Sequence, residues 1–375
     1  MLIGFPKEAD LLESRIAILP TTIKKYTSIG LKVGIESGLG EKLYISDQQF
    51  TENGAEIFAN KKKLLLASDL VVRVKKSPKD DISLLKENAI HVSFLDPFNE
   101  PELIKHFAKK NISAISMELI PRTTIAQKMD AISSQANLAG YAAVVLAASR
   151  LYKAFPMMVT AAGTVEPSRV FIIGVGVAGL QAIATAKRMG ARVEAFDTRK
   201  ETEEQVKSLG AKFINIDLGE TGQTKDGYAK ALTDEQLAKQ RQEVTKVCAR
   251  SDLIITTAQV FGKRAPLLIT KDMIKQMQPG TVIVDMAVAS GGNVDGSVNG
   301  QEVIIGGVKI IGNSNLPGTI ALHASQMYSN NIYHLIEHFW DKETSVFKDN
   351  QEDEIMRGCL LTSNNQIIHP QLKNK

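Results

Sequence analysis

Cysteine is scarce in this sequence of 375 residues, which holds only Cys248 and Cys359. The two lie far apart and lack the spacing of metal ligands. Disulfide frameworks belong to small secreted domains, so the near absence of cysteine indicates a reducing compartment. The six histidines form no triad, and His334 and His338 make no HExxH motif because Glu337 is misplaced. The sequence therefore predicts no metal site.

Concentrated charge and long apolar runs are also missing. The net charge is +4, and no basic stripe alternates with aromatic residues, so nucleic acid is not an expected partner. We expect the lysines at 61–63 and the run at 73–79 to be solvated surface. The N-terminus has no apolar signal core, and the longest apolar run, 138–149, is shorter than the roughly 20 residues of a membrane-spanning helix. No direct membrane span is predicted.

Short apolar runs do alternate with amphipathic stretches along the chain. We expect strands at 2–5, 31–37, 69–74, 89–95 and 112–117, and again at 169–174, 192–197, 212–216, 252–258, 281–287 and 308–312. We expect helices between them at 20–29, 47–53, 82–87, 101–109, 177–189, 202–209, 234–250 and 271–277. Alternation of this kind predicts parallel sheets covered by helices.

Two longer helices are expected to organise these elements. Residues 130–153 are rich in Ala, Ser, Leu and Val, and residues 319–340 can return the chain to its first domain. The predicted fold is α/β, with two Rossmann-like domains that have parallel sheets, joined by long helices with a cleft between them. The expected domains are 1–130 plus 320–375, and 131–319.

A dinucleotide fingerprint occupies residues 170–199. Gly174, Gly176 and Gly179 form GxGxxG directly after an apolar strand and before a helix, and Asp197 ends the next strand. The glycines permit a tight turn, close approach of a pyrophosphate to the backbone, and close packing of helix on strand. The alternative is a glycine-rich turn that binds nothing. The predicted cofactor-binding residues are Gly174, Gly176, Val177, Gly179, Asp197, Thr198, Tyr228 and Ala258.

Asp197 also bears on the choice of cofactor. A carboxylate can accept hydrogen bonds from both ribose hydroxyls, each contributing about 1.5–3 kcal/mol, and it repels a 2′-phosphate. We therefore expect NAD(H) to be preferred over NADP(H). Arg199 could in principle meet a phosphate, but we expect it to be a solvated surface side chain.

The stretch RTTIAQKMDAISSQANLAGY, residues 122–141, lacks Cys, His and paired acids. It sets Arg122, Gln127, Asp130 and Ser133 just before a helix of small residues, and these four are the predicted catalytic residues. Structural alternatives remain open. Asp130 is a favoured N-cap type, and Arg122 can pair with it.

Three stretches carry a resemblance to a known family: RTTIAQKMDAISSQANLAGYAAV, AFPMMVTAAGTVEPSRVFIIGVGVAGLQAIATAKRMGA and GYAKAL. Nearly the whole chain resembles the NAD(H)-binding component, domain I, of proton-translocating nicotinamide nucleotide transhydrogenase, of the Si–Re-specific type, and more distantly alanine dehydrogenase. The resemblance implies hydride transfer from NADH to NADP⁺ in the NADP(H) site of a partner subunit, coupled to proton translocation by a membrane subunit. It also implies a homodimer, peripheral on the cytoplasmic face of a bacterial inner membrane, unless the chain is an excised domain.

The resemblance also implies residue roles. Arg122, Asp130 and Ser133 would hold the nicotinamide carboxamide and nearby ribose or phosphate, and Gln127 would reach toward the partner's NADP(H). Transfer between two nicotinamides exchanges no proton at the reacting carbons, so positioning suffices. The polar segment 217–236 would be a mobile flap with Tyr228 at its tip, or else an unimportant insertion with an exposed tyrosine.

Two other functions remain in view. An alanine dehydrogenase needs a general acid/base, but this chain has Asp96 where that family has histidine, and Ala289 where it has aspartate. Arg15 and Lys75 do persist at substrate-binding positions. A non-enzymatic NAD(H)-responsive module is the third possibility.

Overall fold

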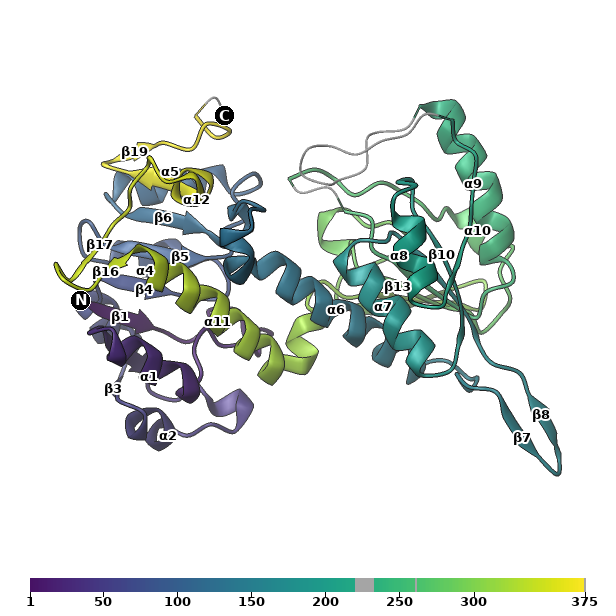
Figure 1. Ribbon diagram of the computed structural model, residues 1–375, viewed down its shortest axis with the longest axis horizontal. Coiled ribbons are helices and arrows are strands. Elements are labelled where there is room, and N and C mark those ends of the chain that lie inside the picture. The colour runs from purple at the N-terminus through teal and green to yellow at the C-terminus, as the bar shows by residue number, and fades with distance from the viewer. Residues whose placement is uncertain (220–232, 260–261, 374–375) are drawn as a thin grey trace. The chain divides into compact units, whose positions relative to one another are not determined.

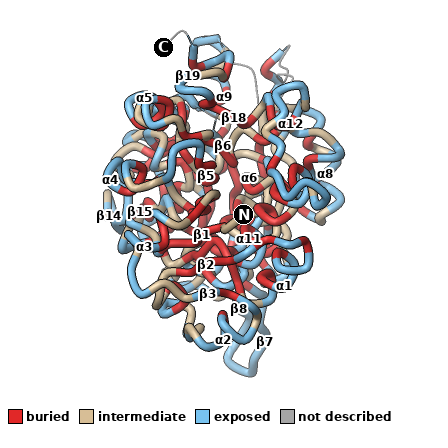
Figure 2. The backbone as a smooth tube through the Cα atoms, turned by 90° about the vertical axis from the view of Figure 1, so that its left-hand side faces the viewer, coloured by how far each residue is buried: buried red, intermediate tan, exposed pale blue. Residues whose placement is uncertain are grey.

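The computed structural model describes residues 1–219, 233–259 and 262–373. The chain divides into two compact units, and each is described by itself (Figure 1). The first unit comprises Met1–Gln135 and Gly318–Lys375, and the second comprises Ala136–Pro317. Figure 2 shows that buried residues concentrate in central strands such as β1, β5 and β6, whereas the segment labelled β7 and β8 is exposed.

The first unit is built on an eight-stranded sheet. Its strands are β1 (Leu2–Phe5), β2 (Lys32–Glu36), β3 (Ala55–Phe58), β4 (Leu70–Val72), β5 (Ile90–Ser93), β6 (Ser113–Ser116), β18 (Leu360–Ser363) and β19 (Gln366–Ile367). They lie in the order β19-β18-β6-β5-β4-β1-β2-β3, with β1 to β6 parallel and the last two strands antiparallel. The order β3-β2-β1-β4-β5-β6 is that of a Rossmann fold.

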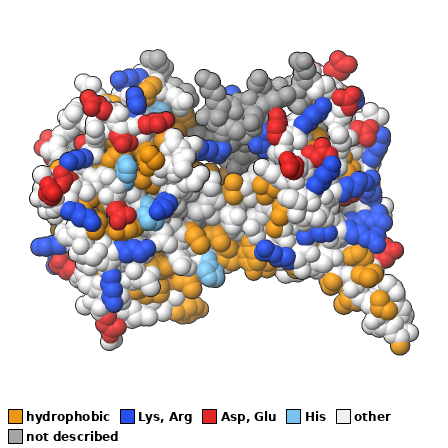
Figure 3. Space-filling model, viewed as in Figure 1, with side chains coloured by type: hydrophobic (Ala, Val, Ile, Leu, Met, Phe, Trp, Pro, Cys, Tyr) orange, Lys and Arg blue, Asp and Glu red, His pale blue; other side chains and the backbone are white. Residues whose placement is uncertain are grey.

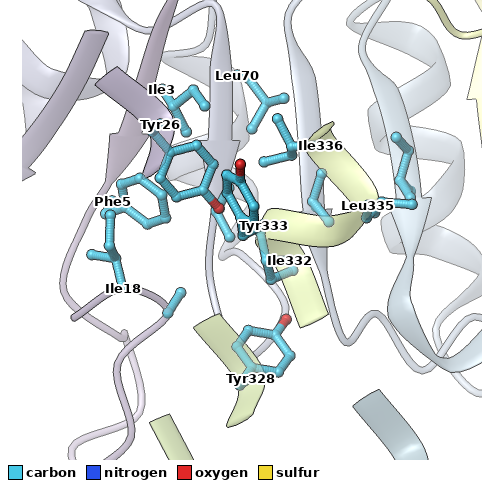
Figure 4. Close-up of a cluster of buried hydrophobic side chains, with 14 of the residues drawn as sticks. Ile3, Phe5, Ile18, Tyr26, Leu70, Tyr328, Ile332, Tyr333, Leu335 and Ile336 are labelled. Carbon is cyan, nitrogen blue, oxygen red and sulfur yellow. The ribbon is translucent and has the colours of Figure 1, made fainter. Parts of the chain in front are cut away.

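Helices from both ends of the sequence complete this unit. They are α1 (Pro20–Ser28), α2 (Asp47–Glu52), α3 (Lys61–Ala67), α4 (Lys79–Ser83), α5 (Pro101–Lys109), α11 (Ala321–Phe339) and α12 (Glu354–Cys359). Tyr26 of α1 packs edge-on against Tyr333 of α11, with ring centroids 5.2 Å apart, in the core shown in Figure 4. The return of the chain in α11 thus contributes directly to the core of the first unit.

The second unit is a seven-stranded sheet. Its strands are β9 (Arg169–Ile173), β10 (Arg192–Phe196), β11 (Lys212–Phe213), β12 (Leu253–Thr256), β13 (Val282–Asp285), β14 (Gln301–Ile305) and β15 (Val308–Gly312). Their order is β11-β10-β9-β12-β13-β15-β14, and only β14 runs antiparallel. The helices are α7 (Val177–Arg188), α8 (Thr202–Ser208), α9 (Asp234–Cys248) and α10 (Lys271–Ile274). The strand order reverses between β9 and β12, where open α/β sheets bind ligands.

Helix α6 (Ala131–Ala148) begins in the first unit and continues into the second. Its Gly140 lies against α7, since a Cβ there would collide with the carbonyl oxygen of Ala178. Within the described ranges of the chain, α6 alone is long and apolar enough to cross a membrane by length and composition. Soluble core helices pass the same test, and Ala142, Ala143 and Ala147 of α6 are buried.

The predicted α/β fold class, with two Rossmann-like domains and parallel sheets, is confirmed. Several local expectations were wrong. Arg73, expected at the surface, is fully buried and pairs with Asp81 (Nη2–Oδ2 2.5 Å). Lys61 begins α3 and binds the same carboxylate (2.9 Å). The helix expected at 82–87 instead spans Lys79–Ser83, where Asp80 and Asp81 favour a helix N-terminus.

Candidate functional site

The glycine turn between β9 and α7 has the geometry that the fingerprint predicts. Gly174 has φ +100°, a region that favours glycine, and a Cβ there would lie 2.5 Å from Thr257 Oγ1. Thr257, which follows β12, donates its hydroxyl to the Gly174 carbonyl (3.0 Å). A Cβ on Gly179 would collide with that same carbonyl oxygen. Gly174 and Gly179 are therefore required by the packing of the turn itself.

Gly176 differs from the other two glycines. It is the N-cap of α7, with φ −84° and ψ −167°, and its surroundings leave nothing within 4 Å of an added Cβ. Any residue can adopt this extended conformation, so the protein itself does not need glycine here. No side chain caps the helix, and the N-terminal N–H groups carry the positive end of the helix dipole. Open space beside these donors fits a pyrophosphate.

Asp197 lies directly after β10 and is tied to the turn. Its Oδ2 accepts a hydrogen bond from the Val175 N–H (2.7 Å), and its Oδ1 accepts one from the Arg199 N–H (2.9 Å). The Arg199 guanidinium adds two more, from Nε to Oδ1 (2.9 Å) and from Nη2 to Oδ2 (2.8 Å). The carboxylate is thus oriented beside the glycine turn.

The expectation that Arg199 is a solvated surface side chain was wrong. Only 16% of its side chain is exposed, and its hydrogen bond to Asp197 raises the pKa of Arg199. A planar guanidinium matches a carboxylate with two parallel bonds, which explains the pairing. The sequence held one usable signal, the spacing of two residues between the acid and the arginine.

The remaining predicted cofactor residues are placed less completely. Val177, 40% exposed, is the first residue of α7, and Thr198 follows Asp197. The Ala258 carbonyl, just after β12, accepts a hydrogen bond from Asn293 Nδ2 (2.9 Å). Tyr228 lies outside the described residues. Sequence reasoning missed Thr257 and Asn293, although Thr257 could have been suspected from its place after a central strand.

In the first unit, Asp130 caps helix α6. Its Oδ1 accepts from the Ser133 N–H (2.8 Å) and its Oδ2 from the Ser133 hydroxyl (2.6 Å). The predicted residues Asp130 and Ser133 are therefore in direct contact, and the N-cap alternative holds as a structural role. Each carboxylate oxygen keeps a further lone pair for a ligand.

The loop before Asp130 is anchored on both sides of Gln127. The 3-10 helix η3 (Ile125–Met129) buries Ala126 and Met129 in the core, while Gln127 is exposed. The Gln127 carbonyl accepts the Asp130 N–H (3.3 Å). Arg122, also exposed, begins the loop. A fixed backbone that carries an exposed amide is suited to contact with a molecule outside this chain.

Arg15 and Lys75 are neutralised within the first unit. The Arg15 guanidinium binds Glu13 with two bonds (2.8 and 2.7 Å) and Gln135 Oε1 with a third (2.8 Å). Lys75 Nζ binds Asp10 Oδ2 (2.7 Å). Burial acts to raise the pKa of Glu13, but the Arg15 bonds outweigh it and lower the pKa. In the described ranges, no three His, Cys, Asp or Glu side chains could hold a metal ion.

Two family profiles match the chain. "Alanine dehydrogenase/PNT, N-terminal domain" matches residues 4–139, and "Alanine dehydrogenase/PNT, C-terminal domain" matches residues 143–370.

Individual relatives separate the two enzymes of that description. The first section of NAD(P) transhydrogenase subunit alpha from Rhodospirillum rubrum, a separate chain, is 43% identical over 379 residues, 99% of each chain. A structure of transhydrogenase from Sinorhizobium meliloti is similar with a TM-score of 0.86 at 37% identity, covering 99% of this chain and 100% of that one. Alanine dehydrogenase of Methanococcus maripaludis is 30% identical over 298 residues, 79% of this chain and 74% of its own. The predicted resemblance is confirmed, with alanine dehydrogenase the more distant relative.

Proposed function

Because this chain belongs to the alanine dehydrogenase/PNT family, we propose that it is the NAD(H)-binding subunit of a proton-translocating NAD(P) transhydrogenase. The observation that carries the proposal is the 43% identity, along 99% of both chains, with the transhydrogenase alpha chain of Rhodospirillum rubrum. We assign NAD(H) binding to the second unit, residues 131–319 in the predicted domain boundaries. The first unit, with residues 320–375, is the alanine-dehydrogenase-like domain that carries the transfer loop.

The second unit binds the dinucleotide through backbone and carboxylate groups. The open space at Gly176 admits the pyrophosphate to the N–H groups of α7, including that of Val177. Asp197 accepts hydrogen bonds from the adenosine ribose hydroxyls. Its two oxygens already accept four bonds in the protein alone, which fills its roughly four lone-pair sites. Ribose binding therefore exchanges bonds with the Arg199 guanidinium.

The first unit positions the reacting ring. When bound, NADH supplies a hydride from C4 of its dihydronicotinamide to C4 of NADP⁺ held by the partner subunit, so NADH is oxidised and NADP⁺ is reduced. Asp130 and Ser133 hold the carboxamide and nearby ribose, and Arg122 holds ribose or phosphate. Gln127, exposed on its anchored loop, aligns the partner's nucleotide. Orientation and exclusion of water supply the rate, since no proton moves at the reacting carbons.

Transfer with a partner tests this proposal. Wild-type protein is mixed with a transhydrogenase NADP(H)-binding subunit loaded with an NADP⁺ analogue, and NADH oxidation is followed optically. We expect transfer only when both proteins are present. Normal NADH binding without any transfer would contradict the assignment.

Alanine dehydrogenase activity is the second candidate, favoured only by Arg15 and Lys75. Both cations are paired internally, and Asp96 and Ala289 replace the family's acid–base groups. NAD⁺ reduction by alanine without a partner would support it. We expect no formation of NADH when alanine and NAD⁺ are supplied, because the general acid/base is missing.

Asp197→Ala should reduce the preference for NADH over NADPH. The wild-type carboxylate binds ribose hydroxyls and repels a 2′-phosphate, and its loss frees Arg199 to meet that phosphate. We expect NADH affinity to fall by about 10-fold, which corresponds to about 1.4 kcal/mol, while NADPH affinity rises. Fluorescence titration with both nucleotides measures this. An unchanged ratio of the two dissociation constants would remove the ribose role.

We propose that the protein acts as a homodimer that docks, with its NADP(H)-binding and membrane subunits, on the cytoplasmic face of the bacterial inner membrane. The hairpin of β7 (Met158–Thr160) and β8 (Gly163–Val165) supports self-association, because its apolar side chains are exposed. Figure 3 shows these hydrophobic side chains gathered along the hairpin labelled in Figure 1. Monomeric proteins rarely expose such patches without an interaction.

Val159→Asp should weaken the dimer. Val159 is 72% exposed, so the charge does not disturb folding of the single chain, but it would be buried on association. Analytical ultracentrifugation should show a dissociation constant higher by about 10-fold or more. Val346→Asp, at an exposed position of β17 (Val346–Phe347) in the first unit, is the control. A dimer of wild-type strength in Val159→Asp would exclude the hairpin.

A further inference from the structure

Asn331 of α11 joins the transfer loop to the start of α6. Its Nδ2 donates to the Lys128 carbonyl (2.8 Å), and its Oδ1 accepts from the Ser134 hydroxyl (2.7 Å). The residue is 7% exposed. One planar amide thus connects the backbone beside Gln127 with the first turn of the helix that Asp130 caps. We propose that Asn331 is a positioning residue for hydride transfer, an inference that rests on the function proposed for Gln127.

The contacts around Gln127 explain why this bond has influence. On one side, Ala126 is buried and its N–H binds the Thr123 carbonyl (3.1 Å). On the other side, the Gln127 carbonyl accepts the Asp130 N–H (3.3 Å), at the long end of the hydrogen-bond range. Lys128 lies between these points, and its carbonyl is held by a side chain of the core helix α11. Asn331 therefore fixes the backbone directly after Gln127.

Burial makes the amide hard to replace. Removing the donor leaves the Lys128 carbonyl without its Asn331 partner, and such a loss shifts the local backbone. Reacting groups tolerate little displacement, since misplacement by 1 Å can cost about 100-fold in rate. NADH binding at the glycine turn and Asp197 depends on residues of the second unit. The transfer step and nucleotide affinity should therefore respond differently to changes at Asn331.

Asn331→Asp and Ser134→Ala separate the two bonds. Asn331→Asp keeps the side-chain size and the acceptor for Ser134, but it turns an oxygen toward the Lys128 carbonyl. Ser134→Ala removes the other bond and leaves the Nδ2 donor in place. With the NADP(H)-binding subunit present, we expect Asn331→Asp to lower kcat by about 10-fold or more, with the NADH dissociation constant and KM within about 2-fold of wild type. Ser134→Ala should keep at least half of wild-type kcat.

Ser329→Ala is the matched control for stability. Ser329 lies two residues earlier on α11, is fully buried, and donates to Thr22 Oγ1 (2.9 Å) without touching the loop. Melting temperatures of all variants are compared, and hydrogen exchange at the Ala126 and Asp130 amides reports on the loop. Asn331→Ala provides a second test if Asn331→Asp does not fold, with faster exchange at these amides and the same loss of kcat expected.

The outcomes are distinct. If wild type transfers hydride and the folded Asn331 variants do so within 2-fold, the positioning role is wrong and the proposed function stands. The role is equally wrong if Ser329→Ala loses kcat to the same extent at the same melting temperature. If wild type itself gives no transfer while binding NADH, the proposed function fails first.

Discussion

Replacing Gly176 by alanine is expected to abolish NADH binding while leaving the fold as stable as wild type. An added methyl group at this position meets no protein atom within 4 Å, and the backbone conformation suits alanine. It does occupy the space through which a pyrophosphate approaches the helix N-terminus. We expect NADH affinity to fall by at least about 100-fold, equivalent to about 2.8 kcal/mol, with no loss in melting temperature.

Gly179→Ala provides the contrast. Its methyl group would collide with the backbone carbonyl oxygen of Gly174, so the turn or the helix must shift. Overpacking of this kind destabilises by about 1–3 kcal/mol or more. Thermal denaturation and NADH titration of the two variants together distinguish space needed by the protein from space needed by its ligand. Tight NADH binding by the Gly176→Ala protein would mean that the pyrophosphate lies elsewhere.

Gln127→Asn is expected to lower hydride transfer by about 100-fold and to leave NADH affinity within 2-fold of wild type. The change keeps the amide but withdraws it by one methylene from an exposed position on an anchored loop. Neither the glycine turn nor Asp197 is touched. Transfer rates with the partner subunit, measured beside an NADH titration, check both expectations.

Thr124→Ala, an exposed position on the same loop, serves as the control and should transfer at the wild-type rate. The comparison also addresses the non-enzymatic alternative. A binding module has no transfer to lose, so selective loss in Gln127→Asn excludes it. Transfer by Gln127→Asn at the wild-type rate would show that this amide does not align the rings.

Local patterns were sufficient to predict the sheets and the glycine turn. Strands such as β12 and β13 are short, wholly buried apolar runs, which is typical of central parallel strands. The turn at Gly174 and Gly179 follows from glycine spacing next to a strand. Helix α3 was missed because three lysines begin it, yet Asn60 caps it and Leu64 and Leu65 face the core.

Contacts between distant residues could not be predicted in the same way. Asn331 meets Lys128 across 203 positions of sequence, and an asparagine within a helix carries no signal of such a contact. Arg73 looked like a member of a charged surface run, but its pairing with Asp81 makes burial possible. The hairpin at 158–165 has two strands of three residues each, too short for an alternating pattern to stand out.

Direct transfer between two nicotinamide rings is the central claim, and an isotope label tests it most directly. NADH carrying deuterium at the transferred C4 position is incubated in ordinary water with this protein and an NADP⁺-loaded NADP(H)-binding subunit. Mass spectrometry of the product should find the deuterium at C4 of NADPH without dilution by solvent hydrogen. NADPH that lacks the label, or NADH oxidation that proceeds equally well without the partner, would contradict the account.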